Sequence, residues 1–112
     1  MPITNPDYSS LNHEEMAAAI GLKIKHIPLL IMSFIEESTP ILEKIEDAIA
    51  QGDYAAIRAS AHSIKGSAGN LKFTDLYEMA REMEFAATAG DASFAYNEYL
   101  EAIKKGIATI KL

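Results

Sequence analysis

A histidine and a lysine lie one helical turn apart in the segment AHSIKGSAGNL, residues 61–71, whose composition is otherwise that of a helix. The segment also holds Gly66 and Gly69, and each glycine inside a helix costs about 0.5–1 kcal/mol relative to alanine. A neutral imidazole is a good nitrogen nucleophile at pH 7. The glycines beside His62 therefore indicate a ring that something outside the helix must approach closely.

Phosphoryl transfer is a chemistry that suits these residue types. A phosphoryl group on His62 would carry nearly two negative charges, and Lys65 could place its ammonium against the phosphoryl oxygens. Arg58 lies one turn away in the other direction. Gly66 and Gly69 would leave room for a bulky second protein. Each part of the segment would then have a role.

A helical wheel of residues 54–72 places His62 about 140° from the predicted buried seam. We therefore expect an exposed imidazole, with both glycines clearing the outer surface rather than serving a tight helix contact. The seam is formed by small and apolar residues at alternating spacings of four and three, namely Ile57, Ala61, Ile64, Ala68 and Leu71. Arg58, Lys65 and Lys72 recur every seven residues and form a predicted basic ridge between the seam and the histidine.

Helix start and stop signals define the elements that must position these residues. The spacing of Asn12 and Glu15 is that of a helix cap and predicts a short helix over 13–20, ending at Gly21. Pro28 suits the first turn of a second helix. Its apolar stripe keeps its phase across Pro40, which predicts one long kinked helix. A break with a rotated second half is the alternative.

Two Gly-Asp pairs divide the rest of the chain. Gly52 is expected to end the second helix, with Asp53 capping a helix over 54–71. Thr74 is expected to cap a helix over 74–89, in which Met79 and Met83 fill the core. Gly90 and Asp91 should act in the same way before a last helix over 92–110. The predicted inward stripe of that helix is Tyr96, Tyr99 or Leu100, Ile103, Ile107 and Ile110.

The pattern predicts an all-α fold. No segment alternates like a strand, and short links favour antiparallel neighbours. We expect an antiparallel up-down-up-down four-helix bundle with a short extra N-terminal helix. Residues 1–11, which hold two prolines, are predicted to be a flexible arm, and residues 12–112 the domain. The sequence assigns no role to Gly106.

Composition excludes several functions. The 112 residues favour one domain, and the absence of cysteine excludes disulfides and thiolate metal sites. A net charge of −6 argues against a nucleic-acid partner. The longest apolar run, residues 27–35, is too short to span a membrane, and no signal peptide is evident. We therefore expect a cytoplasmic monomer, and Met1 with the compact length favours a free-standing protein.

The segment around His62 closely resembles the active-site segment of histidine phosphotransfer (HPt) domains, which act in multistep phosphorelays. The shared pattern is H-x-x-K-G-x-x-x-x-L, formed here by His62, Lys65, Gly66 and Leu71. Residues 76–91, with the step Met83-Glu84, resemble the family's next helix, and residues 34–53 resemble its preceding helix. The likeness spans about residues 12–111. Pro40 departs from the family pattern and bears on the straightness of the second helix.

This resemblance implies that His62 is the phosphoacceptor, modified on the ring nitrogen remote from the backbone. It makes Lys65 and Arg58 the expected phosphate-stabilising residues, and Gly66 and Gly69 the expected steric clearance. The implied partners are the receiver domain of a hybrid sensor kinase as donor and that of a response regulator as acceptor, with Mg²⁺ bound by the receiver.

The chain itself lacks a phosphate-binding loop and a kinase-like nucleotide signature. We therefore expect a phosphocarrier that is not an enzyme and has no cofactor of its own. Glu-x-x-His steps on inward faces, which a di-metal bundle would need, do not occur, and no metal site is predicted.

Phe85 falls opposite the seam of its helix, and folding the chain back near residue 72 brings it and Arg81 near the height of His62. Phe85 and Arg81 are thus a predicted docking patch for the receiver, unless Phe85 packs on a neighbouring helix. The alternative function is a helical adaptor without covalent chemistry. A histidine-based enzyme is a weaker third, because no second acid, base or nucleophile clearly converges on His62.

Overall fold

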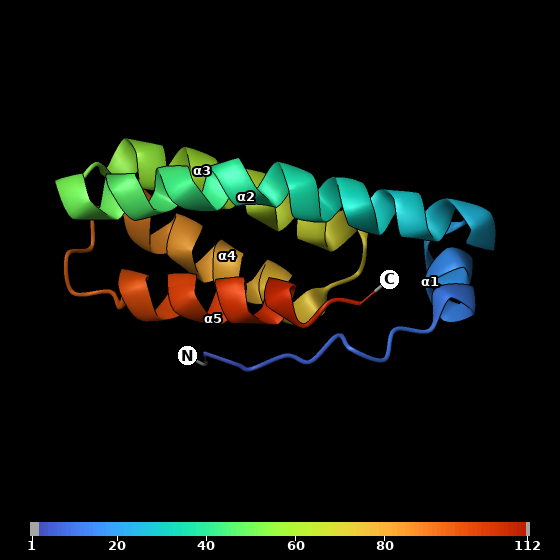
Figure 1. The fold of residues 1–112 in the computed structure, drawn as a ribbon. Coiled ribbons are helices and arrows are strands. Elements are labelled where there is room, and N and C mark those ends of the chain that lie inside the picture. The colour runs from blue at the N-terminus through green and yellow to red at the C-terminus, as the bar shows by residue number, and fades with distance from the viewer. Residues whose placement is uncertain (1–2, 112) are drawn as a thin grey trace.

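The computed structural model describes residues 3–111, which form helices and no strand. Helices α2 to α5 lie side by side as an antiparallel four-helix bundle, and the short α1 packs at one end (Figure 1). The predicted architecture is confirmed. The elements are α1 (His13–Ile20), a 3₁₀ turn (Ile24–His26), α2 (Ile27–Gln51), α3 (Tyr54–Asn70), α4 (Thr74–Thr88) and α5 (Tyr96–Ala108).

Local capping explains where α1 and α2 end and where α3 begins. The Asn12 side chain accepts a hydrogen bond from the backbone N–H of Glu15, and α1 ends at Gly21 in the left-handed conformation. α2 ends in the same way at Gly52, whose φ is 66°. The Asp53 side chain then accepts from the N–H of Ala56 at 3.1 Å and starts α3. These predicted caps are confirmed.

α2 continues through Pro40 as one helix of 25 residues, which confirms the single predicted helix. Buried residues occur on both sides of the proline, with Phe34 before it and Leu42 after it. Just before the proline, the Ser38 hydroxyl donates to the carbonyl of Phe34 at 2.6 Å, so this buried polar group is satisfied within its own helix. The kink at Pro40 stays a prediction.

The beginning of α4 differs from the prediction. Thr74 is the first helical residue rather than the cap, and the cap position is held by Phe73, which gives no side-chain hydrogen bond. Phe73 is 1% exposed, and its N–H donates to the carbonyl of Ala68 at 2.9 Å. Lys72 makes the reversal possible with a φ of 64°. Burial of one aromatic ring thus fixes the α3–α4 turn.

α5 begins at Tyr96, four residues later than the predicted start. Asp91 does not cap a helix; its carboxylate accepts from the N–H of Ser93 at 2.9 Å and from the Ser93 hydroxyl at 2.6 Å. Phe94 packs its ring 4.5 Å from that of Tyr99, which holds the intervening loop against the bundle. The predicted inward stripe is confirmed, since Tyr96, Tyr99, Leu100, Ile103, Ile107 and Ile110 are all buried.

The described part of the N-terminal arm runs beside α5 (Figure 1). The N–H of Tyr8 donates to the Thr109 hydroxyl at 2.8 Å, and the Tyr8 ring lies 4.6 Å from that of Phe73. A Cβ at Gly106 would lie 3.0 Å from Pro6 and 2.9 Å from Leu76. Gly106 therefore lets the arm and α4 approach α5 closely. The arm's flexibility stays a prediction, and residues 1–2 lie outside the described residues.

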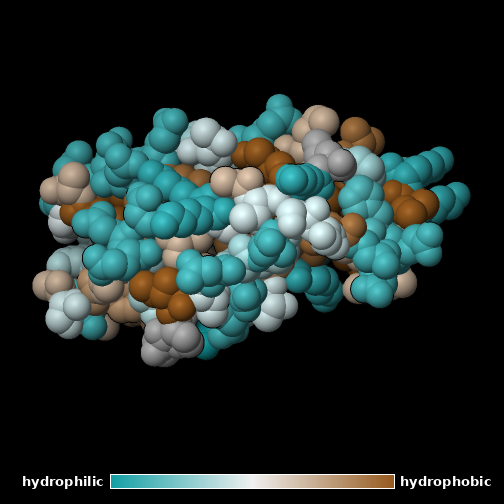
Figure 2. Space-filling model, turned by 60° about the horizontal axis from the view of Figure 1, so that its bottom comes forward, coloured by the Kyte–Doolittle hydropathy of each residue, from teal (hydrophilic) through white to brown (hydrophobic). Residues whose placement is uncertain are grey.

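The surface carries few large apolar side chains. Figure 2 shows that the lower face of the molecule is mostly hydrophilic, with apolar side chains in separate spots. In residues 3–111 no single helix is long and apolar enough to cross a membrane; α1 and residues 24–51 meet that test only as a pair bent by 103°. Among residues 3–111, the large exposed apolar residues are Ile3, Leu22, Ile24, Leu29, Met32 and Phe85.

Candidate functional site

His62 stands on the outer face of α3, with 67% of its side chain exposed. The helix buries its opposite face against the bundle, which follows from the seam predicted from the sequence. The predicted exposure of the imidazole is therefore confirmed. The buried seam consists of Ile57, Ala61, Ile64, Ala68 and Leu71.

Glu84 on α4 contacts both His62 and Lys65 on α3. One carboxylate oxygen, Oε2, lies 2.8 Å from Nδ1 of His62, and the other, Oε1, lies 2.7 Å from Nζ of Lys65. His62 and Lys65 lie almost one turn apart on the same helix. The antiparallel packing of α3 and α4 brings the carboxylate between them. The three side chains form one hydrogen-bonded cluster at the surface.

The charge of Glu84 decides which ring nitrogen carries the proton. Burial alone would raise the pKa of the Glu84 carboxyl, but the hydrogen bonds from Lys65 and His62 outweigh it and lower that pKa below its ordinary value of 4.5. Glu84 is thus ionised at neutral pH, and a carboxylate only accepts hydrogen bonds. Nδ1 of His62 must then be the donor, which leaves Nε2 with the free lone pair of the neutral ring.

Gly66 leaves open space one turn after His62. A Cβ built at this position would have nothing within 4 Å, which agrees with the predicted clearance. Gly69 does not fit the same prediction. A Cβ there would lie 3.1 Å from Cδ1 of Tyr77 on α4, so Gly69 serves close packing between α3 and α4. The wheel of α3 alone could not show where the Tyr77 ring lies.

The predicted basic ridge is shorter than expected. Lys65 is 23% exposed and engaged with Glu84. Arg58 is exposed and has no ion-pair partner among residues 3–111. Lys72 lies beyond the end of α3, with a φ of 64° that turns the chain away from the helix. Of the three residues of the predicted ridge, only Arg58 and Lys65 therefore lie on the same helix as His62.

Phe85 is 62% exposed on the outer face of α4, so the alternative that it packs on a neighbouring helix is wrong. Arg81 lies one turn before it, with Cζ 5.4 Å from the centre of the Phe85 ring. The Arg81 guanidinium also donates to Glu78 at 3.1 Å. Because Phe85 follows Glu84 directly, it lies near the height of His62, as predicted. A docking role for Phe85 and Arg81 stays a prediction.

The sequence prediction did not assign a role to Glu84. The step Met83-Glu84 was a point of family resemblance, but nothing local showed that Glu84 reaches His62. That contact depends on the register between α3 and α4. A usable signal was available, because folding the chain back near residue 72 places position 84 opposite position 62.

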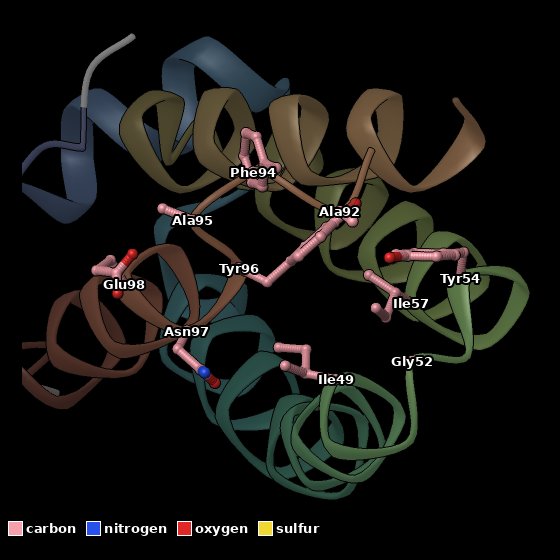
Figure 3. Close-up of a pocket in the computed structure, with 10 residues that line it drawn as sticks. All are labelled: Ile49, Gly52, Tyr54, Ile57, Ala92, Phe94, Ala95, Tyr96, Asn97 and Glu98. Atoms are coloured by element: carbon pink, nitrogen blue, oxygen red, sulfur yellow. The ribbon is translucent and has the colours of Figure 1, made fainter. Parts of the chain in front are cut away.

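A separate cleft of about 270 Å³ lies at the end of the bundle where the α2–α3 and α4–α5 loops meet. Figure 3 shows its walls, with Ile49 from α2, Tyr54 and Ile57 from α3, and Tyr96 from α5. None of the predicted site residues lines it. The cleft is therefore distinct from the cluster around His62.

Comparison with known families agrees with this geometry. The family model described as the Hpt domain matches residues 30–111, more than half of the chain, and the chain therefore belongs to the Hpt domain family. Hpt domains are helical phosphocarriers rather than kinases, and they work with receiver domains in two-component phosphorelays. No match was found among curated proteins or among solved structures. The matched region includes the whole cluster of His62, Lys65 and Glu84.

Proposed function

We propose that this chain is a phosphorelay carrier. Nε2 of His62 accepts a phosphoryl group from the aspartyl phosphate of one receiver domain and passes it to an aspartate of another. The observation that carries the proposal is an exposed imidazole whose Nδ1 lies 2.8 Å from a Glu84 carboxylate oxygen. In the neutral ring this contact places hydrogen on Nδ1 and leaves the lone pair on Nε2. A nucleophile for a partner-borne phosphate needs this combination of access and a free lone pair.

The neighbouring residues have matching roles in this proposal. Lys65 exchanges part of its contact with Glu84 for the phosphoryl oxygens, and Arg58 adds positive charge from the preceding turn. Gly66 leaves space for the receiver's active-site loops. Mg²⁺ belongs to the receiver, and this chain contributes the nucleophile and cations rather than a cofactor.

The receiver is proposed to dock on Phe85 and Arg81, beside the histidine. An exposed aromatic ring next to a guanidinium is a typical anchor in protein interfaces. Phe85 is the most exposed large apolar side chain of α4, and it follows Glu84 directly in the chain. A partner whose aspartate reaches Nε2 would therefore lie within contact distance of the Phe85 ring.

Phosphorylation tests this function against that of an adaptor. The protein is incubated with a receiver domain carrying labelled aspartyl phosphate, and acid-labile, base-stable label is measured on this chain. A carrier acquires label, and His62→Gln abolishes it. His26→Gln is the matched control, because His26 is an exposed histidine in the turn before α2, and it should keep full labelling. Binding of the receiver without label transfer would support the adaptor and reject the carrier.

A further inference from the structure

We infer that the N-terminal arm is a strap that holds the start of α4, with Tyr8 serving as a helix cap supplied from outside the helix. The arm runs beside α5 (Figure 1), and the Tyr8 ring lies 4.6 Å from that of Phe73, the residue at the cap position of α4. The inference goes beyond the proposed function and does not depend on it, because it concerns how the bundle holds one of its helices.

The start of α4 needs hydrogen-bond acceptors that its own cap residue does not supply. The first N–H groups of a helix have no carbonyl partner within the helix, so a side chain or water must accept from them. α1 and α3 use the side chains of Asn12 and Asp53 for this purpose, whereas Phe73 offers no side-chain acceptor. The N–H groups of Asp75 and Leu76, in the first turn of α4, therefore depend on an acceptor from elsewhere.

The Tyr8 hydroxyl meets this need. Burial of the ring, and after it the Asp75 carboxylate, raises the pKa of Tyr8 to about 12, while the backbone N–H groups of Leu76 and Asp75 act on its oxygen in the opposite direction. A hydrogen bond lowers the pKa of a phenol when the phenol oxygen accepts it. The Tyr8 oxygen thus faces the first turn of α4 as the oxygen of a capping side chain does.

Two further contacts fix the arm so that the Tyr8 phenol reaches α4. The N–H of Tyr8 donates to the Thr109 hydroxyl at 2.8 Å, and that hydroxyl donates in turn to the carbonyl of Gly106 at 2.6 Å. Two residues earlier, Pro6 occupies the space beside Gly106, where a Cβ would lie 3.0 Å from the proline ring. Both contacts are made at the end of α5. The arm therefore ties the end of α5 to the start of α4.

Release of the arm would loosen α4 locally. Tyr77 lies in the same first turn, and its ring packs so closely on α3 that a Cβ at Gly69 would lie 3.1 Å from it. Glu84 lies about two turns further along α4 and is held by Lys65, so the cluster around His62 should stay in place. Because coupling is reciprocal, a partner that captured the arm would weaken the start of α4 to the same extent.

Amide hydrogen exchange, measured by nuclear magnetic resonance on the full chain, tests the cap. Tyr8→Phe removes the hydroxyl and keeps the ring against Phe73. The protection of Asp75 and Leu76 should fall by about 2- to 30-fold, the range that corresponds to the ~0.5–2 kcal/mol contributed by a helix cap. Tyr54→Phe is the matched control, because it removes the same group beside the cleft of Figure 3, and it should leave both amides at the wild-type rate.

Thr109→Val tests whether the rest of the arm holds the ring in place. It removes the acceptor of the Tyr8 N–H at the end of α5 and keeps the size of the side chain. It should also lower the protection of Asp75 and Leu76, although it lies outside α4, while the middle of α3 keeps its protection. Wild-type protection of both amides in either Tyr8→Phe or Thr109→Val would overturn the inference. Neither result depends on labelling of His62, so failure of the strap would leave the carrier function intact, and a chain that no receiver labels would leave the strap intact.

Discussion

Nζ of Lys65 lies 2.7 Å from Oε1 of Glu84, so the lysine that is proposed to bind the phosphoryl group is already paired in the unphosphorylated protein. The pair keeps the ammonium beside His62 rather than extended into solvent. Phosphorylation would offer it a second, more highly charged partner. The contact with Glu84 thereby keeps the Lys65 ammonium one helical turn from His62 before any phosphoryl group is present.

Replacing Lys65 with methionine should slow phosphoryl transfer to His62 by about 10- to 100-fold, because a charge-assisted hydrogen bond contributes roughly 1.5–3 kcal/mol. Single-turnover labelling from a phosphorylated receiver measures the rate. Arg58→Met should have a smaller effect, since Arg58 has no fixed contact, and Lys105→Met on α5 is the control. A Lys65→Met protein labelled at the wild-type rate would contradict the phosphate contact.

The two glycines of α3 should respond in opposite ways to substitution. Gly66→Ala should stabilise the fold by about 0.5–1 kcal/mol, because the position is helical and open. Gly69→Leu should destabilise it by about 1–3 kcal/mol, because its Cβ meets Tyr77 at 3.1 Å and the rest of the side chain needs more room. Denaturant unfolding measures both.

Transfer kinetics complete the test of Gly66. Gly66→Leu should fold normally yet accept phosphate from a receiver more slowly than the wild type, because the added side chain occupies the approach to His62. Labelling by phosphoramidate, which is small, should be affected much less. Equal receiver kinetics in wild type and Gly66→Leu would remove the steric argument.

Local chemistry made much of the fold predictable. Asn12 and Asp53 cap their helices through contacts only three residues long, so their pattern can be seen directly in the chain. Asp91 has the same local pattern, but its carboxylate is occupied by Ser93 and the helix starts later. Phe73 likewise displaces Thr74 as the cap residue because its ring is buried. At Asp91 a second local contact competes with the cap, whereas at Phe73 the burial of an aromatic ring overrides the local signal.

The candidate site likewise combines features that can be predicted from one helix with features that need the packed structure. His62 could be predicted because exposure on one helix follows from its own periodicity. The contact of Glu84 and the packing of Gly69 against Tyr77 do not follow from one helix alone, because each depends on the register of α4 against α3. The role of Gly106 depends on a contact between residues far apart in the sequence, because Pro6 occupies the space beside its Cα. Contacts within a helix are encoded locally, whereas contacts between helices need the packed structure.

Substitution of Gly106 should therefore act through the arm. Gly106→Val should lower the free energy of unfolding by about 1–3 kcal/mol, because its side chain would collide with Leu76 and Pro6. In the background of Pro6→Ala the loss should be smaller, since one of the two obstacles is reduced. Strict additivity of the two changes in denaturant unfolding would show that Pro6 and Gly106 do not interact in solution.

The ion pairs of Glu84 should make stability depend on pH. Its pKa is lowered in the folded protein, so its contribution is fully present above the ordinary value of 4.5 and is lost as the pH falls through the folded-state value. Glu84→Gln should thus be less stable than the wild type by about 0.2–1 kcal/mol at pH 7, with the difference disappearing in acid. Thermal or denaturant unfolding at both pH values measures it, and a pH-independent difference would contradict the ionic cause.

The docking patch is tested by adding charge at two exposed apolar positions that lie on different parts of the surface. Phe85→Glu should leave the helical fold intact, because the side chain is 62% exposed, and should weaken receiver binding at least tenfold through loss of a central aromatic anchor. Leu22→Glu introduces the same charge between α1 and α2, where Leu22 is 44% exposed and lines a separate cleft. Receiver affinity and transfer rate are measured for both variants. Leu22→Glu could slow transfer while Phe85→Glu does not. The receiver would then cover the end of the bundle where α1 meets α2, and the docking patch of Phe85 and Arg81 would be wrong.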